Sequence, residues 1–313
     1  MRREYPVTDP FLSDTLNVDD IHSIYYEVSG NPNGKAILHV HGGPGSASKP
    51  GYRQLYNPEK YKIVLFDQRG CGKSVPRGEV RQNTTQDIVE DIEKLRIHLD
   101  IEKWVINGPS WGSAIALVYA QKHPERVNAL ILRGVFLGSK EQVEWLTKKG
   151  ANMLFPDLWE RVMVEFNEDE DLLSAFKQKL NSYQGDDLIR LVEAWNGWES
   201  NLLKLFQERD FEQITLEEAE EERHSINIFL HYFENDCFLQ DGEIIQKIDL
   251  IRNIPTVIMN GRYDVISTVK PAWELHKAWP EADFFILEDA GHHGSEKSIL
   301  DKTIEYTDKY SEL

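Results

Sequence analysis

Short runs of apolar residues recur along the chain, and they are rich in the branched and aromatic side chains that favour β-strands. Strands that are buried on both faces of a parallel sheet give such unbroken runs rather than an alternating pattern. The runs therefore predict six buried parallel strands, at 36–40, 63–66, 104–106, 129–132, 256–259 and 284–287.

A different spacing marks the segment between the second and third runs. Apolar residues recur there every three or four positions, as on one face of a helix, at Ile88, Ile92, Leu95 and Leu99. Thr84 and Asp87 match a capping box, so we expect a helix over 84–99. Strands alternating with helices indicate an α/β fold, with a mostly parallel central sheet, helices on both faces, and ligands bound beyond the carboxyl ends of the strands.

The alternation of strands and helices stops in the middle of the chain. From about residue 139 to 240 the pattern is mostly helical, and this stretch holds four of the eight tryptophans. We expect an inserted helical cap domain over 139–240 and a core domain formed by 1–138 and 241–313.

The charge of the chain restricts its partners. Acidic residues outnumber basic residues by 53 to 35, a formal net charge of -18. Such a surface repels phosphate backbones and anionic lipid, which argues against nucleic acid and against a membrane. The segment 160–223 alone holds 18 acidic and 7 basic residues. An acidic cap favours cationic substrates, although such residues are also typical of solvated helix faces.

The two cysteines, Cys71 and Cys237, stand in no CxxC or Cys/His spacing. They suggest neither a disulfide framework nor a zinc site, and the pair His39 and His41 lacks a third ligand at a suitable spacing. The N-terminus shows no apolar leader, and no run reaches the roughly 18 apolar residues of a membrane span. We therefore expect a cytoplasmic protein that uses no metal and no cofactor.

The residues 108–112, Gly-Pro-Ser-Trp-Gly, match the GxSxG motif of a nucleophile elbow. The motif follows the predicted strand 104–106 and precedes a helical stretch at 113–122, which is the context that it requires. A sharp strand-to-helix turn strains the serine backbone and exposes the hydroxyl. Ser110 is the candidate nucleophile, and the alternative is an ordinary Ser/Gly turn.

A serine hydroxyl needs a base that accepts its proton and a carboxylate that orients the base. Asp264 and His292 each follow one of the last two predicted strands, His292 in a glycine-containing loop. The order Ser, Asp, His is that of the α/β hydrolases. Asp264 and His292 are therefore the candidates for acid and base, and Asp289 and His293 are weaker rivals.

The segment 41–45, His-Gly-Gly-Pro-Gly, follows the first predicted strand. In an α/β hydrolase this place supplies one backbone donor to the tetrahedral intermediate. We assign that donor to the amide of Gly43 and the second donor to the amide of Trp111, the residue after the candidate nucleophile. The alternative for 41–45 is a glycine turn that serves packing alone.

Together these motifs resemble those of the proline iminopeptidases, a family of α/β hydrolases. The matching segments span nearly the whole chain and are 41–45, 67–74 (Asp-Gln-Arg-Gly-Cys-Gly-Lys-Ser), 83–85 (Asn-Thr-Thr), 110–113, 261–264 (Gly-Arg-Tyr-Asp) and 272–280. The resemblance implies a metal-independent exopeptidase that releases an N-terminal proline from small peptides with a free N-terminus. It also implies a helical cap whose acidic residues hold the amino group of the substrate.

One of these cap residues corresponds to Glu199, in the segment 194–199. A charged amine that leaves water needs a charge-assisted partner, which a buried carboxylate supplies. The alternative for Glu199 is a solvated helix position. The family's second cap glutamate corresponds to Phe229, so half of the expected amine clamp is missing. Glu222 lies seven residues earlier, roughly 10 Å away on a continuous helix, and we expect it to substitute only in part.

Pro109 also replaces a glycine that is usual in the elbow of the family. Because the catalytic candidates are intact while the cap differs, the first hypothesis is a serine exopeptidase that releases proline, or a related N-terminal residue, through an acyl-enzyme. The second is a serine esterase or amidase for uncharged acyl substrates, since Phe229 makes the cap more apolar. The third is a catalytically silent scaffold that binds a ligand or a protein.

Overall fold

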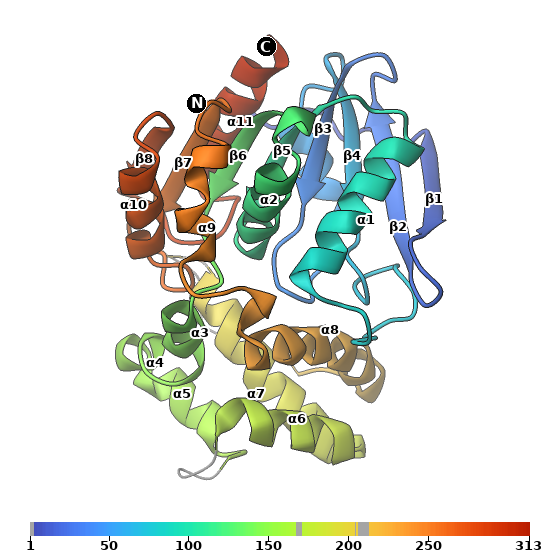
Figure 1. Cartoon of the computed structure of the whole chain (residues 1–313). Helices are drawn as coiled ribbons and strands as arrows, with labels where there is room; N and C mark the ends of the chain where they lie inside the picture. Colours follow the sequence, from blue (N-terminus) through green and yellow to red (C-terminus); the bar gives the residue numbers. More distant parts are fainter. Residues whose placement is uncertain (1–2, 167–170, 204, 206–212) are drawn as a thin grey trace.

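The computed structural model describes residues 3–166, 171–203, 205 and 213–313. Within these ranges the chain forms an eight-stranded sheet in the order β1-β2-β4-β3-β5-β6-β7-β8 (Figure 1). The strands from β3 onward pair in parallel and contain the six predicted runs. They are β3 (Lys35–Val40), β4 (Tyr61–Phe66), β5 (Trp104–Pro109), β6 (Val127–Arg133), β7 (Thr256–Gly261) and β8 (Asp283–Leu287).

Two further strands lie at one edge of the sheet and run antiparallel. Strand β1 (Leu12–Asn17) pairs with β2 (Ser23–Gly30), and β2 pairs with β4. The pattern of apolar runs does not predict either strand. The reason is that β1 is exposed along nearly all its length, while β2 carries serine, tyrosine and glutamate among its buried positions.

Helices cover both faces of the sheet, which confirms the predicted α/β fold. Side chains alternate along each strand, so Leu38 packs with helices α1 and α2, whereas its neighbour Ile37 packs with α11 and η1. The helices of this part are α1 (Thr85–His98), α2 (Trp111–Lys122), α9 (Glu243–Gln246), α10 (Val269–Ala278) and α11 (Lys297–Ser311), with the 3₁₀ helices η1 (Pro50–Leu55), η2 (Pro124–Arg126) and η4 (Ile248–Leu250).

Helix α1 begins at the predicted capping box. Thr84 Oγ1 accepts from the Asp87 N–H (3.2 Å), and Asp87 Oδ2 accepts from the Thr84 N–H (3.0 Å). Reciprocal bonds of this kind satisfy two backbone donors that a helix leaves unpaired at its start. The helix therefore starts where the sequence indicates.

The helices of the segment 139–240, called the cap below, gather beyond one end of the sheet (Figure 1). They are α3 (Lys140–Thr147), α4 (Ala151–Leu154), α5 (Pro156–Met163), α6 (Leu172–Ser182), α7 (Gly185–Leu203), α8 (Leu216–Glu234) and the 3₁₀ helix η3 (Asp236–Phe238). The ring of Tyr232 in α8 lies 4.9 Å from the ring of Trp111, so α8 contacts the start of α2. In the described ranges, no helix combines the length and the apolar character of a membrane span.

Candidate active site

Ser110 lies alone between a strand and a helix. Strand β5 ends at Pro109 and helix α2 begins at Trp111, so the chain turns at a single residue. Ser110 has φ 55° and ψ −128°, a conformation that costs a residue other than glycine about 1–3 kcal/mol. Its N–H donates to the carbonyl of Arg133 at the end of β6 (2.8 Å). The strained turn expected from the GxSxG motif is present.

The side chains of His292 and Asp264 meet in the structure. His292 Nδ1 lies 2.7 Å from Asp264 Oδ2, and the two residues are 6% and 3% exposed. The other carboxylate oxygen, Oδ1, accepts from the N–H groups of Ile266 (3.0 Å) and Ser267 (2.8 Å). Two backbone amides thus fix the carboxylate, which in turn fixes the orientation of the imidazole.

The two rival residues lie differently. The side chain of Asp289 is exposed. His293 Nδ1 bonds the hydroxyl of Ser295, two residues along the chain (2.7 Å). The structure therefore brings together Asp264 and His292, the pair that the sequence favours.

The loop 41–45 lies against the serine turn. A Cβ on Gly42 would lie 3.3 Å from Ser110 Cβ and 3.8 Å from its Oγ. Gly43, the next residue, is exposed, and Trp111 opens helix α2. The first N–H groups of a helix have no partner within the helix and attract anions. Both candidate oxyanion donors therefore belong to segments that adjoin Ser110.

Gln68 joins these two segments, a role that the sequence pattern did not reveal. Its N–H donates to His41 Nε2 (3.0 Å), and its side-chain amide donates to the His41 carbonyl (2.8 Å). Its Oε1 accepts from the indole N–H of Trp111 (2.9 Å). Burial lowers the pKa of the His41 imidazole, so the ring stays neutral at pH 7. One glutamine thus links the 41–45 loop to the start of α2.

Arg133 and Gly134 lie at the end of β6, between the Ser110 turn and His292. The sequence did not predict that either residue belongs to the site. The Arg133 carbonyl accepts from Ser110, and its Nη1 donates to the carbonyl of His292 (2.9 Å). Gly134 has φ 53°, and a Cβ there would lie 2.9 Å from His292 Cε1. Glycine is required here because any side chain would meet the imidazole. Since 159 positions separate Arg133 from His292, no local pattern signals the contact.

Glu199 lines a small pocket in the cap. The pocket is walled by Leu146, Trp195, Trp198, Glu199, Leu202 and Ile266. Ile266 belongs to the loop that holds Asp264, so the pocket adjoins the acid of the site. Glu199 as a residue is exposed, whereas the sequence predicts a buried carboxylate, but its carboxyl lies among the mostly apolar side chains of the pocket. Desolvation raises the pKa of its carboxyl to about 7, and the charge of Glu222 adds to the shift.

Phe229 and Glu222 lie on helix α8, which is continuous from Leu216 to Glu234. Phe229 is buried, with its ring 5.1 Å from that of Trp195 and 4.1 Å from that of Phe233. Glu222 is exposed, but its charge acts on Glu199. The position of the family's second glutamate is thus part of an aromatic wall, and Glu222 is the carboxylate of α8 that acts on Glu199.

His39 and His41 are spaced like a pair of metal ligands, but the sequence offers no third ligand for them. In the structure His39 Nδ1 bonds the hydroxyl of Tyr56 (2.6 Å), and His41 is occupied by Gly42 and Gln68. In the part of the chain that the structure describes, no group of three or more His, Cys, Asp or Glu side chains is arranged to hold a metal ion.

Comparison with known proteins places the chain in a family. A family model described as the alpha/beta hydrolase fold matches residues 35–298. A probable proline iminopeptidase of Leptolyngbya boryana is 43% identical, with 99% of this chain and 97% of that protein covered. The proline iminopeptidase of Xylella fastidiosa is 42% identical over 99% and 100% of the two chains, and that of Arabidopsis thaliana is 41% identical over 100% and 83%.

This chain belongs to the proline iminopeptidase family. It is a prolyl aminopeptidase-like hydrolase, and the resemblance first seen in its motifs is confirmed over the whole length. Solved structures of more distant proteins share the fold. An alpha/beta fold family hydrolase of Bacillus anthracis has a TM-score of 0.64 at 20% identity, over 96% of this chain and 100% of its own. An esterase of Exiguobacterium antarcticum has a TM-score of 0.62 at 19% identity, with the same coverage.

Proposed function

We propose that this iminopeptidase-family hydrolase is a serine exopeptidase that releases proline, or a related N-terminal residue, from small peptides through an acyl-enzyme. The observation that carries the proposal is the buried pair of His292 and Asp264 (2.7 Å) close to the strained turn at Ser110. His292 engages Asp264 through Nδ1, which leaves Nε2 to accept the proton of the serine hydroxyl.

In the proposed reaction Ser110 Oγ attacks the carbonyl carbon of the N-terminal residue while His292 accepts the hydroxyl proton. The oxyanion that forms accepts hydrogen bonds from the amides of Gly43 and Trp111. The imidazolium then protonates the departing peptide nitrogen, and the C–N bond breaks to leave an acyl-enzyme. Water, activated by the same imidazole, hydrolyses the ester and returns Ser110 to its hydroxyl form.

Glu199 is the proposed partner of the substrate's amino group. Its carboxyl lies in a mostly apolar pocket next to the Asp264 loop, where an ion pair is screened less than at an open surface. Glu222 would support the same cation from a greater distance, since its charge already acts on Glu199. We also propose a cytoplasmic location, which two buried and unpaired cysteines support.

A second candidate function is favoured by Phe229. Its ring packs on Trp195, a residue that lines the pocket, at the position that corresponds to the family's second glutamate, so the pocket is backed by an apolar side chain there. This arrangement also suits an uncharged acyl group, as in a serine esterase or amidase. The two functions differ in whether the substrate needs a free amine.

A matched pair of substrates separates them. We expect proline-naphthylamide to be cleaved at least tenfold more efficiently, in kcat/KM, than its N-acetylated form, because the acetyl group removes the charge that Glu199 pairs with. Amides of other N-terminal residues, measured alongside, define the preference that Phe229 imposes. Equal turnover of the acetylated amide, or a strong preference for short acyl esters, would support the esterase instead.

A further inference from the structure

Helix α8 lies on the core along a row of glycines. A Cβ on Gly45 would lie 2.2 Å from the carbonyl of Ser225, and one on Gly70 would lie 2.7 Å from the side chain of Ile228. Ser225 and Ile228 are three residues apart and so lie on the same side of the helix. The glycines belong to the segments 41–45 and 67–74, so two motifs of the core form the surface on which α8 rests.

Asn83 bonds the same helix near its end. The hydroxyl of Tyr232 donates to Asn83 Oδ1 (2.7 Å), and His231 Nε2 bonds the Asn83 carbonyl (2.8 Å). Tyr232 is fully buried, and its ring packs edge-on against Trp111, the residue after the proposed nucleophile. Asn83 is therefore separated from the serine turn by only two aromatic side chains.

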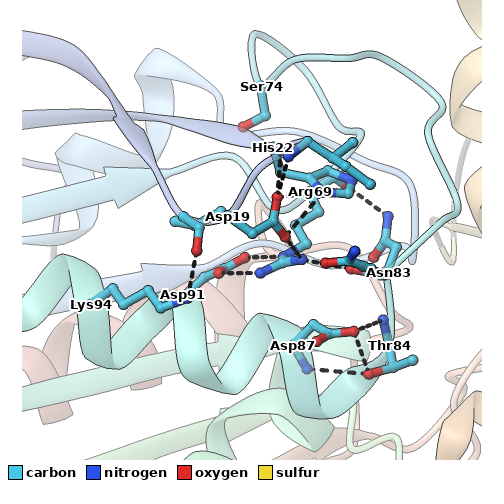
Figure 2. Close-up of polar contacts among 12 residues, drawn as sticks. Asp19, His22, Arg69, Ser74, Asn83, Thr84, Asp87, Asp91 and Lys94 are labelled. Atoms are coloured by element: carbon cyan, nitrogen blue, oxygen red, sulfur yellow. Dashed lines mark hydrogen bonds and ion pairs between the residues drawn. The ribbon is translucent and has the colours of Figure 1, made fainter.

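Asn83 is itself held in one orientation by a polar network (Figure 2). Its Nδ2 donates to the carbonyls of Arg69 (3.2 Å) and Glu79 (2.8 Å), so its Oδ1 is the atom that faces Tyr232. The guanidinium of Arg69 bonds both oxygens of the buried Asp91 (2.5 and 2.6 Å) and also bonds Asp19. The network is anchored in α1 and in the loop before β2, so Asn83 is held by the core and not by the cap.

Helix α8 supports the cap pocket from behind, through its contact with Trp195. Phe229 lies three residues before Tyr232 and packs on Trp195, a wall of the pocket that holds Glu199. A slip of one residue would move α8 by about 1.5 Å and rotate its side chains by about 100°. Phe229 would then lose its contact with Trp195, and Glu222 would move relative to Glu199.

We propose that Asn83 is a positioning residue that fixes the register of α8 through Tyr232 and thereby sets the selection of the N-terminal residue. The inference rests on the proposed function, because the property that it positions is recognition of a substrate amine. Asn83 does not touch the substrate in this account. Its effect reaches the substrate through the aromatic wall and the carboxylates of the cap.

The test is a double-mutant cycle with Tyr232→Phe and Asn83→Ala. Each single variant is expected to raise KM for proline-naphthylamide roughly tenfold, since small displacements of positioning groups have effects of this size or larger. Turnover of a short acyl ester is expected to stay within about twofold. The double variant is expected to be no worse than either single one, because both remove the same hydrogen bond.

Gln86→Ala is the matched control. The Gln86 side chain also donates across the junction of core and cap, to the Phe238 carbonyl (2.9 Å), but this bond is exposed and ends on η3 rather than α8. It is expected to leave both substrates unchanged. Tyr232→Phe removes one hydroxyl only, so it keeps the test valid if Asn83→Ala does not fold.

Three results would overturn the inference: single variants with unchanged KM, additive losses in the double variant, or equal losses on amide and ester. Failure of the proposed function gives a different result. In that case the unmodified enzyme itself cleaves no amide with a free N-terminal amine, whatever the variants do.

Discussion

Two effects raise the pKa of the Glu199 carboxyl. Its pocket is mostly apolar, and the charge of Glu222 acts on it, so both desolvation and repulsion raise its pKa, to about 7. A carboxyl with this pKa is ionised above pH 7 and neutral below it. Because only the ionised form attracts an ammonium group, amine recognition should weaken as the pH falls.

Substrate preference should therefore depend on pH. The ratio of kcat/KM for proline-naphthylamide to that for a neutral ester should fall several-fold from pH 7.5 to 6, since kcat/KM reports ionisations of the free enzyme. Taking the ratio cancels any pH dependence of the chemical step that the two substrates share. A ratio that is flat over this range would contradict the role of Glu199.

Two variants sharpen the measurement. Glu199→Gln should lower the ratio at every pH and abolish its pH dependence. Glu222→Gln removes the repulsion, so the pKa of Glu199 should decrease and the preference for the amine should persist to lower pH. A profile that moves to higher pH in Glu222→Gln would show that the two carboxylates do not interact in this way.

At the scale of single residues, the sequence predicts those that local motifs identify and misses those whose role depends on contacts with distant parts of the chain. Ser110, Asp264 and His292 each follow a predicted strand, so their place at one edge of the sheet could be inferred. Gln68 and Arg133 could not, because their partners are distant in sequence and neither belongs to a general motif for the reaction. The exposure of Glu199 also depends on the packing of the cap, which no local pattern sets.

At the scale of elements, the end of β6 joins the Ser110 turn to the loop that carries His292. Gly134→Ala should lower kcat at least about 100-fold on amide and ester alike, because its Cβ would meet the imidazole of His292 at 2.9 Å. Steady-state kinetics on both substrates, with circular dichroism as a check of folding, measure the effect.

Gly185→Ala is the control for this variant. Gly185 has nearly the same φ, 55° against 53°, but a Cβ there would meet nothing within 4 Å. Both substitutions therefore place an alanine at a positive φ, and only one of them reaches the histidine. If Gly185→Ala loses activity to the same extent, the loss comes from strain and not from displacement of the imidazole.

Strands and helices that carry a regular apolar pattern or a capping motif could be predicted from the sequence. Elements that carry neither could not. The six parallel strands lie within a few residues of the apolar runs, and α1 starts at its capping box. Strand β1 gives no such signal because one edge of it is unpaired and most of its side chains face water. Gly45 and Gly70 belong to motifs that the sequence shows, but their contacts with α8 could not be predicted, because that helix is distant in sequence.

For the molecule as a whole, the net charge of -18 should affect the encounter with substrate. The Debye length is about 30 Å at 0.01 M salt and about 8 Å at 0.15 M, so the attraction of a cationic substrate is strongest at low salt. We expect kcat/KM for proline-naphthylamide to fall several-fold as salt rises from 0.01 to 0.5 M, while that for a neutral ester stays constant. Equal salt effects on the two substrates would contradict electrostatic attraction by the protein.

The central claim is that one serine hydroxyl, activated by His292 and Asp264, cleaves N-terminal proline from its substrate. Its most direct test is hydrolysis of proline-naphthylamide by the unmodified enzyme and by Ser110→Ala, with labelling by a fluorophosphonate probe on the same samples. We expect the unmodified enzyme to hydrolyse the amide and to be labelled. In Ser110→Ala we expect labelling to be lost and turnover to fall by roughly four powers of ten or more. A Ser110→Ala enzyme that still hydrolyses the amide at an undiminished rate would contradict this claim.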